Sequence, residues 1–220
     1  MSGSSGLPAI VVLISGQGTN LQALIDASRD GRLPARIAAV ISDRADAPGL
    51  ERARRAGIEA IAMSPRGFAA RAAFERALGD AIAAHAPAAV VLAGFMRVLG
   101  ADLVGRFEGR MLNVHPALLP RHRGLDTHRR VLEAGDREHG ATVHFVTAEL
   151  DAGPRVIQYR LRVSAQDSAE TLAARVHRGE HMILPRASGW LAAGRLSVVG
   201  DQVWLDGKRL AEPVVIEEES

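Results

Sequence analysis

The chain has 220 residues, 47% of them hydrophobic and 24% charged, and it carries a formal net charge of +2 at pH 7. This is the balance of an ordinary soluble globular protein, and no apolar run reaches the roughly 18 residues that a spanning helix needs, so we expect no membrane partner. The chain contains no cysteine, which excludes disulfides and thiolate chemistry and fits a reducing cytoplasm. The high sequence pI, about 9.8, comes from arginines that are scattered along the chain, so we expect no nucleic-acid partner.

The first half of the chain alternates between short apolar runs and helical patterns. The predicted strands cover residues 9–14, 36–42, 58–63 and 88–93, and a fifth ends near His115. The predicted helices cover residues 21–29, 48–57, 68–85 and 101–107. This alternation predicts a doubly wound, mostly parallel α/β sheet of Rossmann-like type, with helices on both faces.

The second half departs from this rhythm. A helix is expected at 127–134, followed by β runs at 141–146 and 156–163 and by a long helix over 168–191 that should break or kink at Pro185. Residues 196–199 and 202–205 predict a small C-terminal hairpin. We therefore expect a flexible leader at 1–8, a single domain at 9–212 and an acidic, solvent-exposed tail at 213–220.

A glycine-rich turn, SGQGTN at residues 15–20, follows the first predicted strand. Gly16 and Gly18 let the backbone approach an anion closely, and the start of the next helix offers N–H groups to a phosphate. Three interpretations remain open: a site for a single phosphate, a plain tight turn, and the dinucleotide site of a nicotinamide-binding Rossmann oxidoreductase. The last needs a small residue where the chain has Leu21, although Asp43 stands about where a ribose-binding acid would.

The segment MLNVHPALLP, residues 111–120, ends a predicted buried strand with Asn113 and His115. Alternate residues of a strand point the same way, so these two side chains should project together. Asp151, in a turn after a later β run, could orient the imidazole and raise its pKa. The simpler interpretations are a strand-terminal histidine bonded to backbone and an acid in an exposed turn.

Five segments together resemble the phosphoribosylglycinamide formyltransferases, which are folate-dependent enzymes of purine synthesis. They are ISGQGTNLQALID (14–26), VVLAGFMRVL (90–99), NVHPALLP (113–120), GATVHFVTAELDAGP (140–154) and WLDGKRL (204–210). The resemblance implies transfer of a formyl group from 10-formyltetrahydrofolate to the amine of glycinamide ribonucleotide, by a monomer or homodimer and without a metal. The phosphate site would lie in the N-terminal half, and the folate and catalytic residues in the C-terminal half. A formyltetrahydrofolate hydrolase stays open as the alternative, although such enzymes usually add an N-terminal regulatory domain.

The resemblance also implies roles for individual residues. Asn113 and a protonated His115 would stabilise an oxyanion, while Asp151 would keep His115 charged and help to move a proton. The residues implied in binding the substrate phosphate are Gly18, Thr19 and Asn20. Those implied in binding the rest of the ribonucleotide are His177 and Glu180. Those implied in binding the folate are Arg71, Met96, Arg97, Val98, Leu99, Ala148, Glu149 and Leu150.

Three residues depart from the pattern of these formyltransferases. His122 stands where an aromatic residue is frequent, Asp126 where histidine is usual, and His177 where Gln or Lys is common. These differences bear on substrate contacts rather than on the reaction. In addition, His122, Asp126 and His128 lie at no recognised metal-ligand spacing, which is a further reason to expect no metal site.

Overall fold

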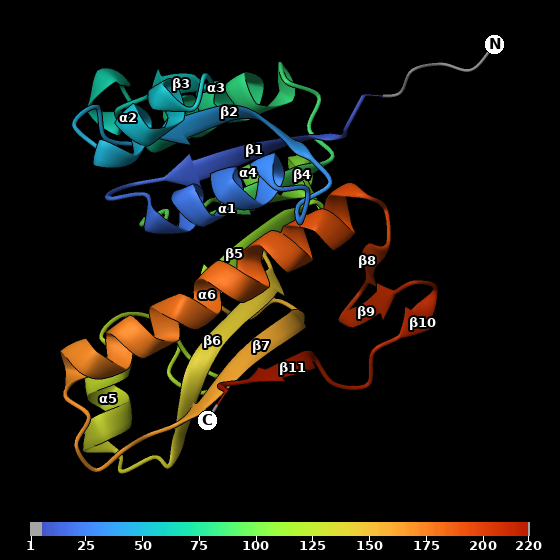
Figure 1. Ribbon diagram of the computed structural model, residues 1–220. Helices are drawn as coiled ribbons and strands as arrows, with labels where there is room; N and C mark the ends of the chain where they lie inside the picture. Colours follow the sequence, from blue (N-terminus) through green and yellow to red (C-terminus); the bar gives the residue numbers. More distant parts are fainter. Residues whose placement is uncertain (1–5, 220) are drawn as a thin grey trace.

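A computed structural model describes residues 6–219, and residues 1–5 of the expected leader lie outside this range. Eight strands form one sheet in the order β11-β7-β6-β5-β4-β1-β2-β3 (Figure 1). Their bounds are β1 Ala9–Ile14, β2 Arg36–Ser42, β3 Glu59–Ala62, β4 Ala89–Leu92, β5 Met111–His115, β6 Glu138–Phe145, β7 Arg155–Arg162 and β11 Val214–Glu217. Within this sheet only β6 runs antiparallel to its neighbours, so the expected mostly parallel α/β fold is confirmed.

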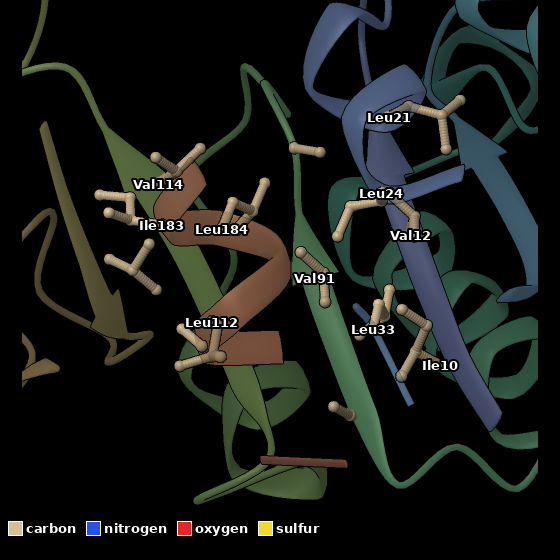
Figure 2. Packing of buried hydrophobic residues seen from close by; sticks show 14 of the residues in the cluster. Ile10, Val12, Leu21, Leu24, Leu33, Val91, Leu112, Val114, Ile183 and Leu184 are labelled. Atoms are coloured by element: carbon tan, nitrogen blue, oxygen red, sulfur yellow. The ribbon is translucent and has the colours of Figure 1, made fainter. Parts of the chain in front are cut away.

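Helices cover both faces of the sheet because its central strands are apolar on both sides. The helices are α1 Thr19–Arg29, α2 Pro48–Arg55, α3 Arg71–Ala83, α4 Ala101–Arg106, α5 Thr127–Glu133 and α6 Ala169–Ala192. Ile10 and Val12 of β1 pack with α1, α2 and α6, whereas Val11 and Leu13 pack with α3 and α4. Figure 2 shows the first of these layers, in which Ile183 of α6 lies beside β5.

The long helix α6 crosses one face of the sheet (Figure 1). It begins at a capping box, in which the Ser168 and Thr171 side chains bond each other's backbone N–H groups. Of the expected break or kink at Pro185, the break does not occur: the helix continues to Ala192 with that proline buried. Buried residues on both sides of the proline, including Leu184 and Ala187, hold the two halves on the same sheet.

The C-terminal part differs from the prediction in two ways. The expected hairpin exists as β8 Leu196–Val199 and β9 Gln202–Leu205, but β10 Lys208–Arg209 extends it to a three-stranded antiparallel sheet. The expected acidic tail is wrong for residues 214–217, which form β11 parallel to β7. Its acidic residues find partners there: Arg160 Nη2 lies 2.8 Å from Glu217 Oε1. Val214 and Ile216 also pack on the main core, so this segment belongs to the sheet.

The fold brings three loops to one edge of the sheet. Strands β1, β4 and β5 are parallel neighbours, so their carboxyl ends meet. The backbone N–H of Ser15 donates to the carbonyl of Gly94 at 3.1 Å, and the N–H of Met96 donates to Ser15 Oγ at 2.8 Å. The glycine-rich turn and the loop after β4 are therefore bonded to each other. No helix among the described residues has the length and apolar character needed to cross a membrane.

Candidate active site

The glycine-rich turn leads into the first residue of α1. Gly18 has a φ of 71° and is the N-cap of α1, and no side chain caps that helix. A Cβ at position 18 would lie 2.7 Å from the Cα of Gly49, so both the backbone angle and the contact with α2 require glycine there. The first N–H groups of α1 remain open to an anion, which supports the predicted phosphate seat.

Thr19 and Asn20 reach from α1 to α6. His177 Nε2 lies 2.6 Å from Thr19 Oγ1, and Asn20 Nδ2 donates to Glu180 Oε2 at 2.7 Å. His177 Nδ1 donates to the same Glu180 oxygen at 2.8 Å, and this hydrogen bond raises the pKa of His177. Asn20 Oδ1 is buried and has no hydrogen-bond partner among the described residues. The structure thus gathers the side chains predicted to bind the ribonucleotide beside Gly18.

A cavity of about 520 Å³ opens beside the ends of β4 and β5. Large apolar side chains stand exposed around it, among them Met96 (71%) and Leu125 (77%). Such a rim suits a ligand with a flat apolar part. Of the residues predicted to bind folate, Met96, Arg97, Val98, Leu99, Glu149 and Leu150 line this cavity, Arg71 lines an adjoining one, and Ala148 lines neither.

Asn113 projects into this cavity and is held by His144, its partner on the antiparallel strand β6. His144 Nδ1 donates to the carbonyl of Phe145 at 2.8 Å, so its Nε2 can accept from Asn113 Nδ2 at 3.1 Å. This fixes one N–H of the amide and leaves the second N–H for a ligand. Sequence reasoning assigned no role to His144, because the register of β6 on β5 cannot be read from either segment alone.

His115 is almost fully buried, and both of its ring nitrogens face oxygen atoms. Nε2 donates to the carbonyl of His122 at 2.9 Å, and Nδ1 lies 3.3 Å from Asp151 Oδ2. The second contact has the distance of an ion pair without the alignment of a hydrogen bond, so Nδ1 is not committed to Asp151. Asp151 Oδ2 accepts from the backbone N–H of Gly124 at 3.0 Å, and Asp151 Oδ1 lies 3.7 Å from His144 Nε2. The three predicted catalytic side chains therefore meet in one cavity.

Burial and the neighbouring groups shift the pKa values of His115 and Asp151 in the ligand-free protein. Burial lowers the pKa of His115 below its ordinary value, and the His122 carbonyl and Asp151 offset this only in part. Burial would raise the pKa of Asp151, but its polar neighbours, among them the donating N–H of Gly124, hold it below its usual value. At pH 7 the free protein thus holds a carboxylate beside a neutral imidazole. In the ligand-free protein Asp151 therefore offsets only part of the cost that burial imposes on a charged imidazole at His115. That Asp151 keeps His115 protonated during catalysis stays a prediction.

Two further histidines lie next to the cavity. His128 lines it, and His128 Nδ1 lies 3.0 Å from Nε2 of the buried His139. Burial, with His128 as the next largest cause, lowers the pKa of His139 to about 3. Across residues 6–219 there is no group of three or more His, Cys, Asp or Glu side chains that could hold a metal ion.

We expect His139 to make the protein sensitive to acid. The unfolded chain binds a proton at this residue below about pH 6.5, whereas the folded chain does so only near pH 3. The free energy of unfolding should therefore fall as the pH drops between these values, by about 1.4 kcal/mol per pH unit from this residue. Urea denaturation of His139→Gln should show a shallower loss than the wild type between pH 6.5 and about 5. Equal losses of unfolding free energy in the variant and the wild type would show that His139 is not the cause of the acid sensitivity.

Comparison with known proteins shows the family of the chain. Residues 9–188 match the formyl transferase family model. The chain belongs to this family. It is 51% identical over 201 residues to the phosphoribosylglycinamide formyltransferase of Escherichia coli strain K12, covering 91% of this chain and 95% of the relative. Its place within the family is among the phosphoribosylglycinamide formyltransferases, as the sequence motifs indicated.

Solved structures give the same assignment. The phosphoribosylglycinamide formyltransferase of Coxiella burnetii superimposes with a TM-score of 0.92 at 51% identity, covering 95% of this chain and 99% of that chain. A formyltetrahydrofolate deformylase from Pseudomonas syringae superimposes with a TM-score of 0.83 at 26% identity, covering 92% of this chain and 67% of that chain. The fold is therefore shared by formyltransferases and by a deformylase.

Proposed function

We propose that the chain transfers the formyl group of 10-formyltetrahydrofolate to the amine of glycinamide ribonucleotide, in the synthesis of purines. The observation that carries this proposal is the meeting of Asn113, His115 and Asp151 in a cavity with an apolar rim. The anion seat at Gly18 lies at the same edge of the sheet, because the turn that holds it is bonded through Ser15 to Gly94 and Met96, which line this cavity. A ribonucleotide with its phosphate on α1 can therefore extend its amine toward a folate in the cavity.

The first chemical task is to stabilise the formyl oxygen. When the amine attacks the formyl carbon, negative charge develops on that oxygen. The free N–H of Asn113 supplies a fixed donor, because His144 holds the amide in place. His115 is neutral in the free protein, but an adjacent negative charge favours its protonated form. The imidazole can take at Nδ1 the proton that the attacking amine loses, donate a hydrogen bond to the oxyanion, and then release the proton to the departing folate nitrogen.

The second task is to move a proton. The attacking nitrogen must lose a proton, and the departing folate nitrogen must gain one. Asp151 is ionised and its Oδ2 lies 3.3 Å from His115 Nδ1, so the two groups can pass a proton between these nitrogens directly or through a water. Holding both substrates in line supplies much of the remaining acceleration. No covalent intermediate with the protein is needed.

We further propose that the substrates are small molecules, that the chain acts without a metal as a monomer or homodimer, and that it works in the cytoplasm. The lack of cysteine and the scattered arginines support this setting. The amide and imidazole already supply the electrophilic stabilisation that a metal ion would otherwise provide.

The test is to mix the protein with 10-formyltetrahydrofolate and follow the appearance of tetrahydrofolate with and without glycinamide ribonucleotide. The proposal predicts product only when the ribonucleotide is present, with one formylated ribonucleotide formed per folate. Product without the ribonucleotide would instead assign the hydrolase activity of the deformylase relative. No product in either mixture would overturn both.

Glu180→Gln should weaken binding of the ribonucleotide specifically. The carboxylate of Glu180 holds Asn20 and His177 and is the proposed partner of the glycinamide group. Loss of a hydrogen bond to a charged group costs about 1.5–3 kcal/mol, so KM for the ribonucleotide should rise roughly 10-fold to 100-fold. KM for the folate should change little. The matched control is Glu170→Gln, in the exposed first turn of the same helix, and equal effects of the two variants would contradict the assignment.

A further inference from the structure

The loop after β5, residues 117–125, is bonded to two of the catalytic side chains through its backbone. The carbonyl of His122 accepts from His115 Nε2 at 2.9 Å, and the N–H of Gly124 donates to Asp151 Oδ2 at 3.0 Å. The direction of the His115 ring therefore depends on where the loop places one carbonyl group. The position of that carbonyl depends in turn on Asp136, which contacts the side chain of His122.

Asp136 fastens this part of the loop from outside the catalytic cavity. Its Oδ2 lies 2.7 Å from His122 Nε2, and its Oδ1 accepts from Arg121 Nη2 at 2.6 Å. The side chains of Asp136 and His122 are only 10% and 12% exposed. Burial would raise the pKa of Asp136, but His122 and Arg121 hold it below the usual value, so the group is a carboxylate at neutral pH.

Two features show that this contact serves position rather than substrate binding. Asp136 lines a different cavity, of about 820 Å³, and is absent from the lining of the one that holds Asn113 and His115. In addition, His122 has a φ of 55°, a left-handed conformation that is costly for a residue with a side chain. Contacts must hold the backbone there, and the two hydrogen bonds of His122 are of this kind.

We propose that Asp136 is a positioning residue for His115, acting through the side chain and carbonyl of His122. The expected effect on kcat rests on the proposed function, whereas the expected effect on the position of the His115 ring does not. Without the carboxylate, His122 loses its partner, and the carbonyl is free to leave His115 Nε2. The other groups that affect the pKa of His115 are Asp151, His144 and Glu180, and they are the same in the wild type and in a variant that lacks the Asp136 carboxylate.

The test compares Asp136→Asn with a matched control, Asp167→Asn. Asp167 has a similarly buried side chain that accepts from Arg175 at 2.6 Å, but it precedes α6 and lies outside the catalytic cavity. NMR titration of His115 in the ligand-free proteins gives a readout that needs no activity. Asp136→Asn should lower the pKa of His115, because the raising effect of the His122 carbonyl is weakened, and Asp167→Asn should leave it unchanged.

Kinetic measurements should distinguish Asp136→Asn from Asp167→Asn in the same way. Asp136→Asn should lower kcat about 10-fold and shift the limb of its pH profile that belongs to His115 toward lower pH, with both KM values nearly unchanged. His122→Phe is a second variant that removes the same contact, should Asp136→Asn fail to fold. An unmoved His115 titration in a folded variant, or the same effects in Asp167→Asn, would overturn the inference. Absence of formyl transfer in the wild type would instead overturn the proposed function.

Discussion

Asn113→Ala is expected to lower kcat by about 100-fold or more, which is the usual cost of removing one donor from an oxyanion site. His144 holds Asn113 with one N–H free, so this donor is already in position before the reaction begins. Because the interaction strengthens only as charge develops, KM for both substrates should change far less than kcat. Steady-state kinetics with each substrate varied in turn would measure this.

The control for Asn113→Ala is to check that His144 and the strands around it remain folded. His144 keeps its bond to the Phe145 carbonyl in the variant, so the strand pair β5–β6 should remain intact and the melting temperature should fall only modestly. Wild-type turnover in the folded variant would remove Asn113 from the proposed role.

Asp151→Asn is expected to have an effect of similar or greater size, a loss of roughly 100-fold to 10,000-fold in kcat. The amide has nearly the shape of the carboxylate and can still accept from the N–H of Gly124, so the turn should hold. It carries no charge, however, and so it neither favours protonation of His115 nor carries a proton between the two nitrogens. Stopped-flow or steady-state assays at saturating substrates would measure the loss.

Asp206→Asn is the matched control for this variant. Like Asp151, which has a φ of 50°, Asp206 has a positive φ, of 53°. Its carboxylate pairs with Arg195, and it lies in the turn between β9 and β10, outside the catalytic cavity. It should keep wild-type kcat. A small effect of Asp151→Asn, comparable to that of Asp206→Asn, would contradict the proton-transfer role.

The features that could be predicted from the sequence are those that depend on neighbouring residues in the chain. The alternation of strands and helices predicted a parallel sheet, and a parallel sheet places the ends of β1, β4 and β5 together. The two-residue period of a strand placed Asn113 and His115 on the same side. Histidine chemistry made Asp151 only a candidate partner, and the resemblance to formyltransferases gave it that role; it lies 3.3 Å from His115.

The features that did not follow depend on tertiary packing. The register of β6 on β5, which brings His144 to Asn113, is set by the whole sheet. The lowered pKa of His115 results from burial by segments distant in sequence, and no local pattern reports its extent. Likewise, Val214–Glu217 look like part of a polar tail until the free edge of β7 offers them a place to pair.

The most direct test of the account is the crystal structure of the protein with glycinamide ribonucleotide and a non-reactive folate analogue that carries a ketone in place of the formyl group. The account predicts that the ketone oxygen lies about 3 Å from both Asn113 Nδ2 and His115 Nδ1, with the amine of the ribonucleotide facing the same carbon. A ketone oxygen bound beyond hydrogen-bond distance of both side chains, with the substrates otherwise in line, would contradict it.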